Sequence, residues 1–262
     1  MANASLVVHP SVVWGRPGAV GGDFAAYHAL PSFVPGFASA PLGVFCVDTS
    51  DPVLALTYDD GPHPEHTPRI LDLLGERGLK ATFFVLGRQA ALYPEIVRRT
   101  VAEGHELALH GHDHSSLRTM STLTAVRRIR DARHRVEDIA GVRIRTYRPP
   151  YGAYSLAQAV GIWALGLKLL IWSGDAIDWV DDDEQAIADR ALASAMAGAV
   201  LLLHDDRGDS ETVRSGEELP SFDRAEVLRR LLDGLDARGF SVRSSEELMR
   251  RFANVRSMSP AA

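Results

Sequence analysis

The chain has 262 residues, of which 46% are hydrophobic and 24% are charged, and its formal net charge is −6. This composition is ordinary for a globular protein and allows one large α/β domain or two small ones. Acidic and basic residues are interspersed, which excludes the clustered basic face of a nucleic-acid-binding protein. No stretch approaches the ~18 consecutive apolar residues of a membrane span. The single cysteine, Cys46, excludes an internal disulfide.

The first 50 residues differ from the rest of the chain. They carry glycine, proline and aromatic residues such as Trp14, Tyr27 and Phe37 without clear periodicity. We therefore predict an irregular N-terminal arm at 1–50 that packs on a main domain at 51–262. Residues 1–10 have neither a basic start nor a long apolar run, so no signal peptide is visible. This predicts a cytoplasmic protein, or a secreted one if a leader has been removed.

From Val53 onward, apolar runs alternate with segments of helical periodicity. Continuous apolar runs are typical of strands that are buried on both faces. They predict strands at 53–58, 81–86, 106–109, 146–148, 169–172, 200–203 and 240–243. The periodic segments predict helices at 67–77, 91–103, 121–140, 155–165, 184–197 and 223–238. About seven β/α units in succession imply an α/β fold with a parallel sheet, either open or closed into a barrel.

Polar residues gather where the predicted strands end. The carboxyl ends of parallel strands meet on one face, which is the active-site face of α/β barrels. We therefore expect these side chains to lie close together. In chain order they are Asp59 and Asp60, His110 and His114, Arg148 and Tyr151, Asp175 and Asp178, and His204.

The acids and histidines in this group point to a metal ion. The neighbouring carboxylates of Asp59 and Asp60 repel each other, and a cation or a proton resolves the conflict. His110 and His114 are four residues apart and can face one cation from a single turn of chain. With one carboxylate they make a three-ligand site that leaves positions open for water and substrate. The pattern predicts a metal-dependent hydrolase, the alternative being two ordinary loop histidines.

Five segments together resemble the motifs of the polysaccharide deacetylase family, also called the NodB-homology family or carbohydrate esterase family 4. The resemblance covers about residues 53–250 and leaves residues 1–50 without a counterpart. It implies a distorted (β/α)7 barrel and metal-dependent removal of an acyl group from an N-acyl or O-acyl substrate. The segments are Thr57-Tyr-Asp-Asp-Gly-Pro62, His110-x-x-x-His114, Arg148-x-Pro-Tyr-Gly152, Asp175-x-x-Asp-Trp179 and Leu202-Leu-His204-Asp.

The resemblance implies that Asp60, His110 and His114 are the metal ligands. The family holds a divalent ion, often zinc. The ligand types favour Zn²⁺, while Co²⁺, Fe²⁺ or Ni²⁺ fit similar sites. His112 would point away if its two neighbours converge on the ion, so it is not expected to be a ligand.

The resemblance also implies a general base and a general acid. Asp59 resembles the base that takes a proton from metal-activated water, and Arg148 resembles the arginine that orients this base. A structural ion pair is a compatible reading of Arg148. His204 resembles the acid that protonates the departing amine, which is otherwise a poor leaving group. Asp178 resembles the carboxylate that orients and charges this histidine.

Three further residues are implied to contact the substrate. Tyr151 resembles the residue whose backbone N–H helps to stabilise the oxyanion. Trp179 and Leu202 resemble the apolar lining that accepts the acyl methyl group, or they are ordinary core residues. Asp175 is a motif residue whose role is left open.

The remaining histidines are interpreted as structural or surface residues. His63 and His66 lie between the paired acids and the first predicted helix, where capping or surface roles are expected. His105 precedes a predicted strand and His134 lies on a charged helix. Neither has partners in the sequence that indicate chemistry.

Two substrate classes are open. The motif set favours an enzyme that acts on N-acetylated amino sugars of a glycan, such as peptidoglycan or chitin-like chains. The missing signal peptide favours an intracellular amide hydrolase that removes an acetyl or formyl group from a small metabolite, a lipid-linked sugar or a natural-product intermediate. The family pattern is silent or loose over residues 1–50 and 205–223, and these residues are expected to determine which substrate class is bound. A carbohydrate-binding pseudoenzyme would require a lost motif residue, and none is lost.

Overall fold

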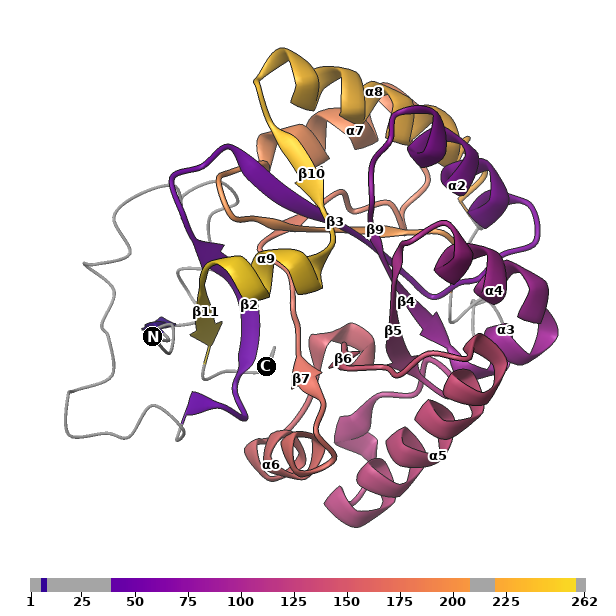
Figure 1. Cartoon of the computed structure of the whole chain (residues 1–262), viewed down its shortest axis with the longest axis vertical. Coiled ribbons are helices and arrows are strands. Elements are labelled where there is room, and N and C mark those ends of the chain that lie inside the picture. Colours follow the sequence, from indigo (N-terminus) through magenta and orange to yellow (C-terminus); the bar gives the residue numbers. More distant parts are fainter. Residues whose placement is uncertain (1–5, 9–38, 208–219, 258–262) are drawn as a thin grey trace.

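A computed structural model describes residues 6–8, 39–207 and 220–257. Its main sheet is parallel throughout and has the strand order β7-β6-β5-β4-β3-β9-β8, with β10 paired to the first half of β3. The sheet curls into an open barrel (Figure 1). The strands are β3 (Val53–Asp59), β4 (Thr82–Leu86), β5 (Glu106–Gly111), β6 (Thr146–Tyr147), β7 (Lys168–Leu169), β8 (Gly174–Asp175), β9 (Val200–His204) and β10 (Ser241–Arg243).

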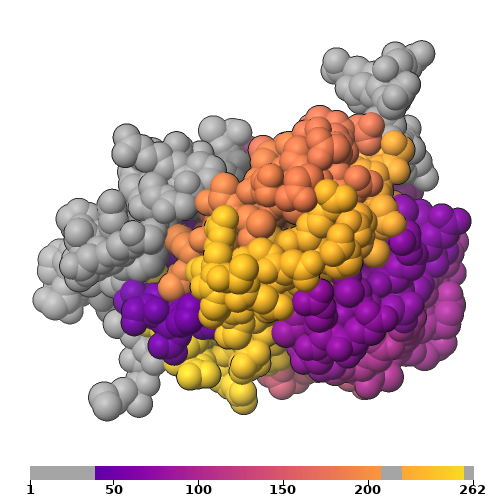
Figure 2. All heavy atoms as spheres, turned by 90° about the horizontal axis from the view of Figure 1, so that it is seen from above, coloured from indigo at the N-terminus to yellow at the C-terminus, as the bar shows by residue number. Residues whose placement is uncertain are grey.

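Helices cover the outside of the curled sheet (Figure 1). They are α2 (His66–Glu76), α3 (Gly87–Leu92), α4 (Pro94–Ala102), α5 (Thr122–Ala140), α6 (Leu156–Ala164), α7 (Glu184–Ala193) and α8 (Arg224–Ala237). Single 3-10 turns lie at Leu117–Thr119 and Pro150–Gly152. Figure 2 shows α7, α8 and α2 following one another across one face, each packed against the next. Among the described residues, no helix has the length and apolar character needed to cross a membrane.

A small second sheet lies beside the open edge of the barrel. It has the order β1-β11-β2 and consists of β1 (Leu6–Val8), β2 (Gly43–Asp48) and β11 (Ala253–Ser257). Isolated bridges join Val44 of β2 to Leu170, just after β7, and Cys46 to Ala199, just before β9. Strand β2 thus connects the two sides of the gap. The short helix α9 (Ser245–Arg251) contacts β3, and its Ser245 N–H donates to Thr82 Oγ1 at the amino end of β4.

The predicted α/β fold of distorted-barrel type is confirmed, and the differences are local. The helix predicted at 91–103 is two helices, because Pro94 lacks an N–H and starts a new first turn. The strand predicted at 169–172 ends early, since the Ile171 N–H donates to Val44 in β2. Strand β2 falls in the segment predicted to be irregular, of which residues 1–5 and 9–38 lie outside the described residues.

The inner face of β3 changes from apolar to polar along its length. Val53 and Ala55 belong to the apolar cluster that fills the barrel interior, together with Phe84 and Val200. Because side chains alternate along a strand, the following inner positions are Thr57 and Asp59. The outward residues of β3 pack instead under the helices. The inner side chains of β3 are therefore apolar and packed in the barrel core at the amino end of the strand, and acidic at its carboxyl end.

Candidate active site

A buried arginine holds the acid at the end of β3. Arg148 is fully buried, and its Nη1 donates to Asp59 Oδ1 at 2.6 Å and to Thr57 Oγ1 at 2.9 Å. Its Nη2 donates to the carbonyl oxygen of Ile171 at 3.0 Å. The guanidinium carbon also lies 4.1 Å from the centroid of the Phe84 ring. Arg148 is therefore fixed from several sides and holds one oxygen of Asp59 in place.

Burial and charge act against each other on Asp59. Burial raises the pKa of its carboxyl to about 6, and the neighbouring Arg148 guanidinium opposes this rise. Asp59 is therefore ionised at neutral pH, yet its pKa is close enough to neutrality for it to accept a proton.

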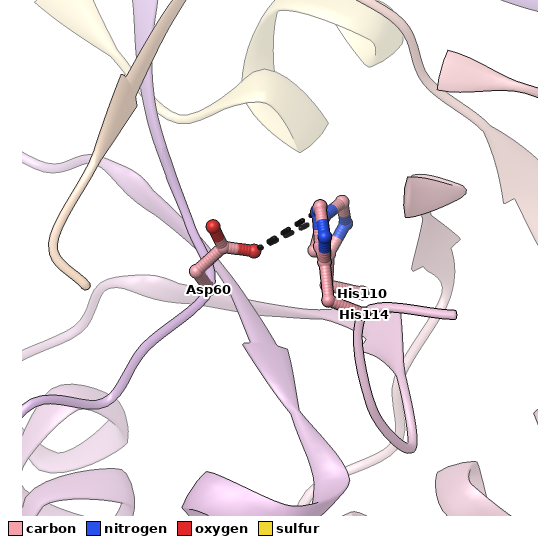
Figure 3. Close-up of side chains that lie close together, drawn as sticks. All are labelled: Asp60, His110 and His114. Atoms are coloured by element: carbon pink, nitrogen blue, oxygen red, sulfur yellow. Dashed lines mark ion pairs between the residues drawn. The ribbon is translucent and has the colours of Figure 1, made fainter. Parts of the chain in front are cut away.

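Asp60, His110 and His114 converge beside Asp59. Figure 3 shows both imidazole rings turned toward the Asp60 carboxylate. Asp60 Oδ1 lies 3.4 Å from His110 Nε2 and 3.5 Å from His114 Nε2. Asp60 has a φ of 79°, a left-handed conformation that aspartate tolerates better than most residues. Its carboxylate thus leaves the direction of the strand and faces His110 at the end of β5 and His114 just after it, two strands away in the sheet.

These three side chains fit a divalent cation. One ligand atom from each lies within 4.8 Å of the others. Ligand atoms at 2.0–2.2 Å from one ion in a tetrahedral arrangement stand about 3.4 Å apart, which is close to the two separations between Asp60 Oδ1 and the histidine nitrogens. The carbonyl oxygen of Arg148 lies 2.9 Å from His110 Nδ1, so this nitrogen carries the hydrogen and Nε2 keeps its lone pair for an ion. His112 is not part of this cluster.

His204 and Asp178 form a second pair opposite the cluster. His204 Nδ1 lies 2.6 Å from Asp178 Oδ1, and the His204 backbone N–H donates to Asp178 Oδ2 at 2.8 Å. Burial lowers the pKa of His204, but the charge and hydrogen bond of Asp178 together with the other nearby acids outweigh this effect. The net pKa of His204 is raised to about 9. Although burial raises the pKa of Asp178, His204 holds it below its ordinary range. The pair is therefore an imidazolium and a carboxylate at neutral pH.

A cavity of about 340 Å³ joins these groups. Eight of the ten predicted site residues line it, while Arg148 and Asp178 lie behind the wall against Asp59 and His204. Three other lining residues were not among the predicted site residues: Trp172, and Asp206 and Arg207, which lie in the segment 205–223 expected to select the substrate. The lining residues are Asp59, Asp60, His110, His114, Tyr151, Trp172, Trp179, Leu202, His204, Asp206 and Arg207.

The three predicted substrate-contact residues lie around this cavity. Tyr151 is half exposed, has a φ of 59°, and its ring is 4.3 Å from that of His114 between centroids. Trp179 stands edge-on to the His204 ring at 5.6 Å, whereas Leu202 is almost fully buried. Gly152 of the same motif has a φ of 62°, and a Cβ there would lie 2.9 Å from Trp172. The glycine thus lets the Tyr151 turn pack closely on the indole.

Asp175 shapes the turn that presents Asp178. Its Oδ1 accepts the N–H of Ile177 at 2.8 Å, and Ile177 has a φ of 54°, which is unusual for a β-branched residue. Among the other histidines, His63 Nδ1 accepts the N–H of His66, the first residue of α2, at 3.3 Å. This contact agrees with the capping role expected for His63.

Comparisons with known proteins agree with the motifs. A sequence profile of the family described as polysaccharide deacetylase matches residues 47–169. The chain is 36% identical over 197 residues to a chitooligosaccharide deacetylase of Sinorhizobium fredii, a match covering 75% of this chain and 91% of that protein. It is 37% identical over 159 residues to the peptidoglycan-N-acetylmuramic acid deacetylase PdaC of Bacillus subtilis, covering 61% of this chain but 33% of that protein.

The fold has solved counterparts as well. The structure of Bacillus subtilis PdaA, a family 4 carbohydrate esterase, superposes with a TM-score of 0.70 at 25% identity, covering 84% of this chain and 91% of that chain. The protein is thus a hydrolase whose α/β fold is built on a curled parallel sheet. It belongs to the polysaccharide deacetylase family, whose members named here are deacetylases of carbohydrates and act on carbon–nitrogen bonds that are not peptide bonds.

Proposed function

We propose that the protein is a divalent-metal-dependent deacetylase that hydrolyses the N-acetyl group of an amino sugar in a glycan. One observation carries the proposal. A single cavity joins the Asp60, His110 and His114 cluster to Asp59 on one side and to His204 on the other. The relatives named as chitooligosaccharide and peptidoglycan deacetylases support an N-acetylated sugar as the substrate class.

Asp60, His110 and His114 would hold the cation, and two imidazoles with one carboxylate favour Zn²⁺ over Co²⁺, Fe²⁺ or Ni²⁺. When bound, such an ion supplies Lewis acidity that polarises the acetamide carbonyl and makes the attacking water more acidic. The carbonyl of Arg148 orients His110 for this task, while its guanidinium orients Asp59. One residue therefore sets the geometry of both a ligand and the base.

Asp59 takes the proton of the attacking water. Arg148 occupies its Oδ1, so Oδ2 is the atom left to accept this proton, and it lies 3.7 Å from His110 Nε2 beside the cluster. Arg148 also keeps Asp59 ionised against the effect of burial. The base is thus charged before the reaction and placed next to the ligands.

His204 gives a proton to the departing nitrogen. Its Nδ1 is engaged by Asp178, which leaves Nε2 to act in the cavity. The raised pKa keeps this ring protonated at neutral pH, as a general acid requires. The C–N bond breaks as the nitrogen gains the proton, and the products are acetate and a free amine.

Tyr151, Trp179 and Leu202 complete the proposed substrate contacts. Tyr151 lies in a left-handed turn and its ring packs against that of His114, which supports a role for its backbone N–H in donating to the oxygen that becomes negatively charged. Trp179 and Leu202 supply apolar surface beside His204, where the acetyl methyl group would lie.

A second candidate is an amide hydrolase of a small metabolite, which would remove an acetyl or formyl group by the same steps. The cavity supports it, because about 340 Å³ lies at the lower end of small-molecule pockets. We further propose that residues 1–50 and 205–223 select between these substrates. A cytoplasmic location would favour this second candidate.

One experiment tests both candidates. The protein loaded with Zn²⁺ or Co²⁺ is incubated with N-acetylglucosamine oligomers, with peptidoglycan fragments and with small N-acetyl and N-formyl compounds, and released acid is measured. We expect acetate from the oligomers and none from an Asp59→Asn variant that still binds metal. Acid from small compounds alone favours the second candidate. No release from any sugar oligomer or small amide contradicts both.

A further inference from the structure

Arg224 is a buried cation that lies within the active-site wall although it belongs to a distant helix. It is the first residue of α8, whose N-cap Asp223 accepts the backbone N–H groups of Ala225 and Glu226. Arg224 is only 6% exposed, which is rare for arginine unless partners satisfy it. Its guanidinium carbon lies 4.9 Å from the centroid of the Phe222 ring. The helix start thus directs this side chain into the barrel.

The buried end of Arg224 meets both members of the His204 and Asp178 pair. Its Nη1 donates to the backbone carbonyl of His204 at 2.7 Å and lies 3.4 Å from Asp178 Oδ2. The same Oδ2 accepts the backbone N–H of His204 at 2.8 Å. These three contacts form a closed ring. The Arg224 guanidinium binds the His204 carbonyl oxygen and Asp178 Oδ2, and the same Oδ2 binds the His204 backbone N–H.

This ring decides how the Asp178 carboxylate is turned. Two donors occupy Oδ2, so Oδ1 is the oxygen presented to the imidazole, where it lies 2.6 Å from Nδ1. Without Arg224 only the His204 backbone N–H would hold Oδ2, and the carboxylate could turn more easily about its last torsion, since such terminal torsions have broad minima. Arg224 also stays charged when His204 loses its proton, so the buried carboxylate keeps a cationic partner throughout.

We infer that Arg224 is a positioning residue for the proposed acid His204, which it serves by fixing the rotation of Asp178 and the backbone of the histidine. The inference rests on the proposed function of His204. Other arginines of α8 provide a contrast, because Arg229 and Arg230 pair with Glu226 on the exposed side of the helix. Arg224 differs from them in burial and in the partner that it holds.

The test compares Arg224→Met and Arg224→Lys with the matched control Arg230→Met on the same helix. For the metal-loaded enzyme we expect Arg224→Met to lower kcat for acetate release about 10- to 100-fold, as small misplacements of a catalytic group do, with KM unchanged. Arg224→Lys should lose less, because an ammonium can still donate to these acceptors but sits on a more flexible side chain than the planar guanidinium. Arg230→Met should retain both constants.

A second readout requires no substrate. The Nδ1-bound proton of His204 is observed by NMR and assigned through its loss in His204→Gln. We expect its signal to shift and broaden in Arg224→Met, to do so less in Arg224→Lys, and to stay unchanged in Arg230→Met. If the wild type releases no acid from any substrate, the proposed function fails while this signal still reports on Arg224.

Two results would overturn the inference. One is an Arg224→Met protein that is less heat-stable but keeps the wild-type kcat and His204 signal when folded, since this would make Arg224 only a stabilising residue. If Arg224→Met does not fold, Arg224→Lys decides, and wild-type values of both readouts in that variant would equally reject a positioning role.

Discussion

The two ends of strand β5 carry polar side chains of contrasting kinds. At its amino end, the partly buried carboxylate of Glu106 accepts the hydroxyl groups of Thr82 at 2.7 Å, Thr146 at 2.9 Å and Ser245 at 2.7 Å, and the backbone N–H of Glu246 at 2.8 Å. At its carboxyl end, His110 faces two acids across separations of 3.4 and 3.7 Å. At the amino end the carboxylate is surrounded by hydrogen-bond donors, whereas at the carboxyl end the side chain lines a cavity.

This contrast separates a structural acid from a reactive one. Glu106 has four donors from three other segments and connects β4, β6 and α9 at the bottom of the barrel. Asp59 and Asp60 instead line a cavity together with His110 and His114, and Asp59 Oδ1 accepts from Arg148. A buried charge whose hydrogen-bonding capacity is filled stabilises a fold, whereas one beside a cavity can bind an ion or exchange a proton.

The largest effect should come from removing a proposed metal ligand that is partly exposed. In His114→Ala we expect bound Zn²⁺ to fall from about one ion per chain to near zero and acetate release to fall to background, because three ligands are the minimum of a catalytic zinc site. Metal content is measured by mass spectrometry after loading and dialysis. The control His134→Ala, on the exposed face of α5, should keep both. A His114→Ala protein with full metal content would contradict the assignment.

Replacing the proposed base, Asp59, should lower activity without removing the metal. Asp59→Asn preserves the shape of the side chain and its contact with Arg148 but cannot accept a proton. We expect kcat to fall about 10²- to 10⁴-fold, the usual contribution of a general base, with metal content unchanged. Steady-state acetate release and metal analysis of the same sample measure the two quantities. A variant that loses its metal together with its activity would place Asp59 among the ligands instead.

The acid should be visible in the pH profile. The pKa of His204, about 9, implies that the protonated ring and hence kcat are lost as the pH rises through 9. In Asp178→Asn the raising charge is gone, so we expect this alkaline limb to move down by about 1–3 pH units. The stabilisation that comes from the raised pKa of His204 is complete at about pH 6.5 and is likewise lost as the pH rises through about 9. Profiles of kcat for both proteins measure the shift, and coincident alkaline limbs would refute it.

The sequence predicted the strands and polar residues around the cavity better than the edges of the barrel. Paired acids, closely spaced histidines and glycine-marked turns are local patterns, and the strands that carry them are continuous apolar runs such as 53–58. Strand β2 and the two-residue strand β8 were missed, because their pairing partners lie far away in the chain. Arg224 was missed for the same reason, since nothing local distinguishes it from the exposed arginines of its helix. Contacts between residues that are far apart in the chain produce no periodic pattern in the sequence, so sequence patterns cannot predict them.

The smallest effect on activity should follow from changing the other end of β5. Glu106→Leu leaves three hydroxyl groups and one N–H without their acceptor, so we expect the free energy of unfolding to fall by about 1–3 kcal/mol while kcat of the folded enzyme stays unchanged. Denaturant unfolding and acetate release measure the two effects. The partly exposed acid Glu226, replaced by alanine, should change stability far less. A loss of kcat without a loss of stability in Glu106→Leu would erase the distinction between the two ends of the strand.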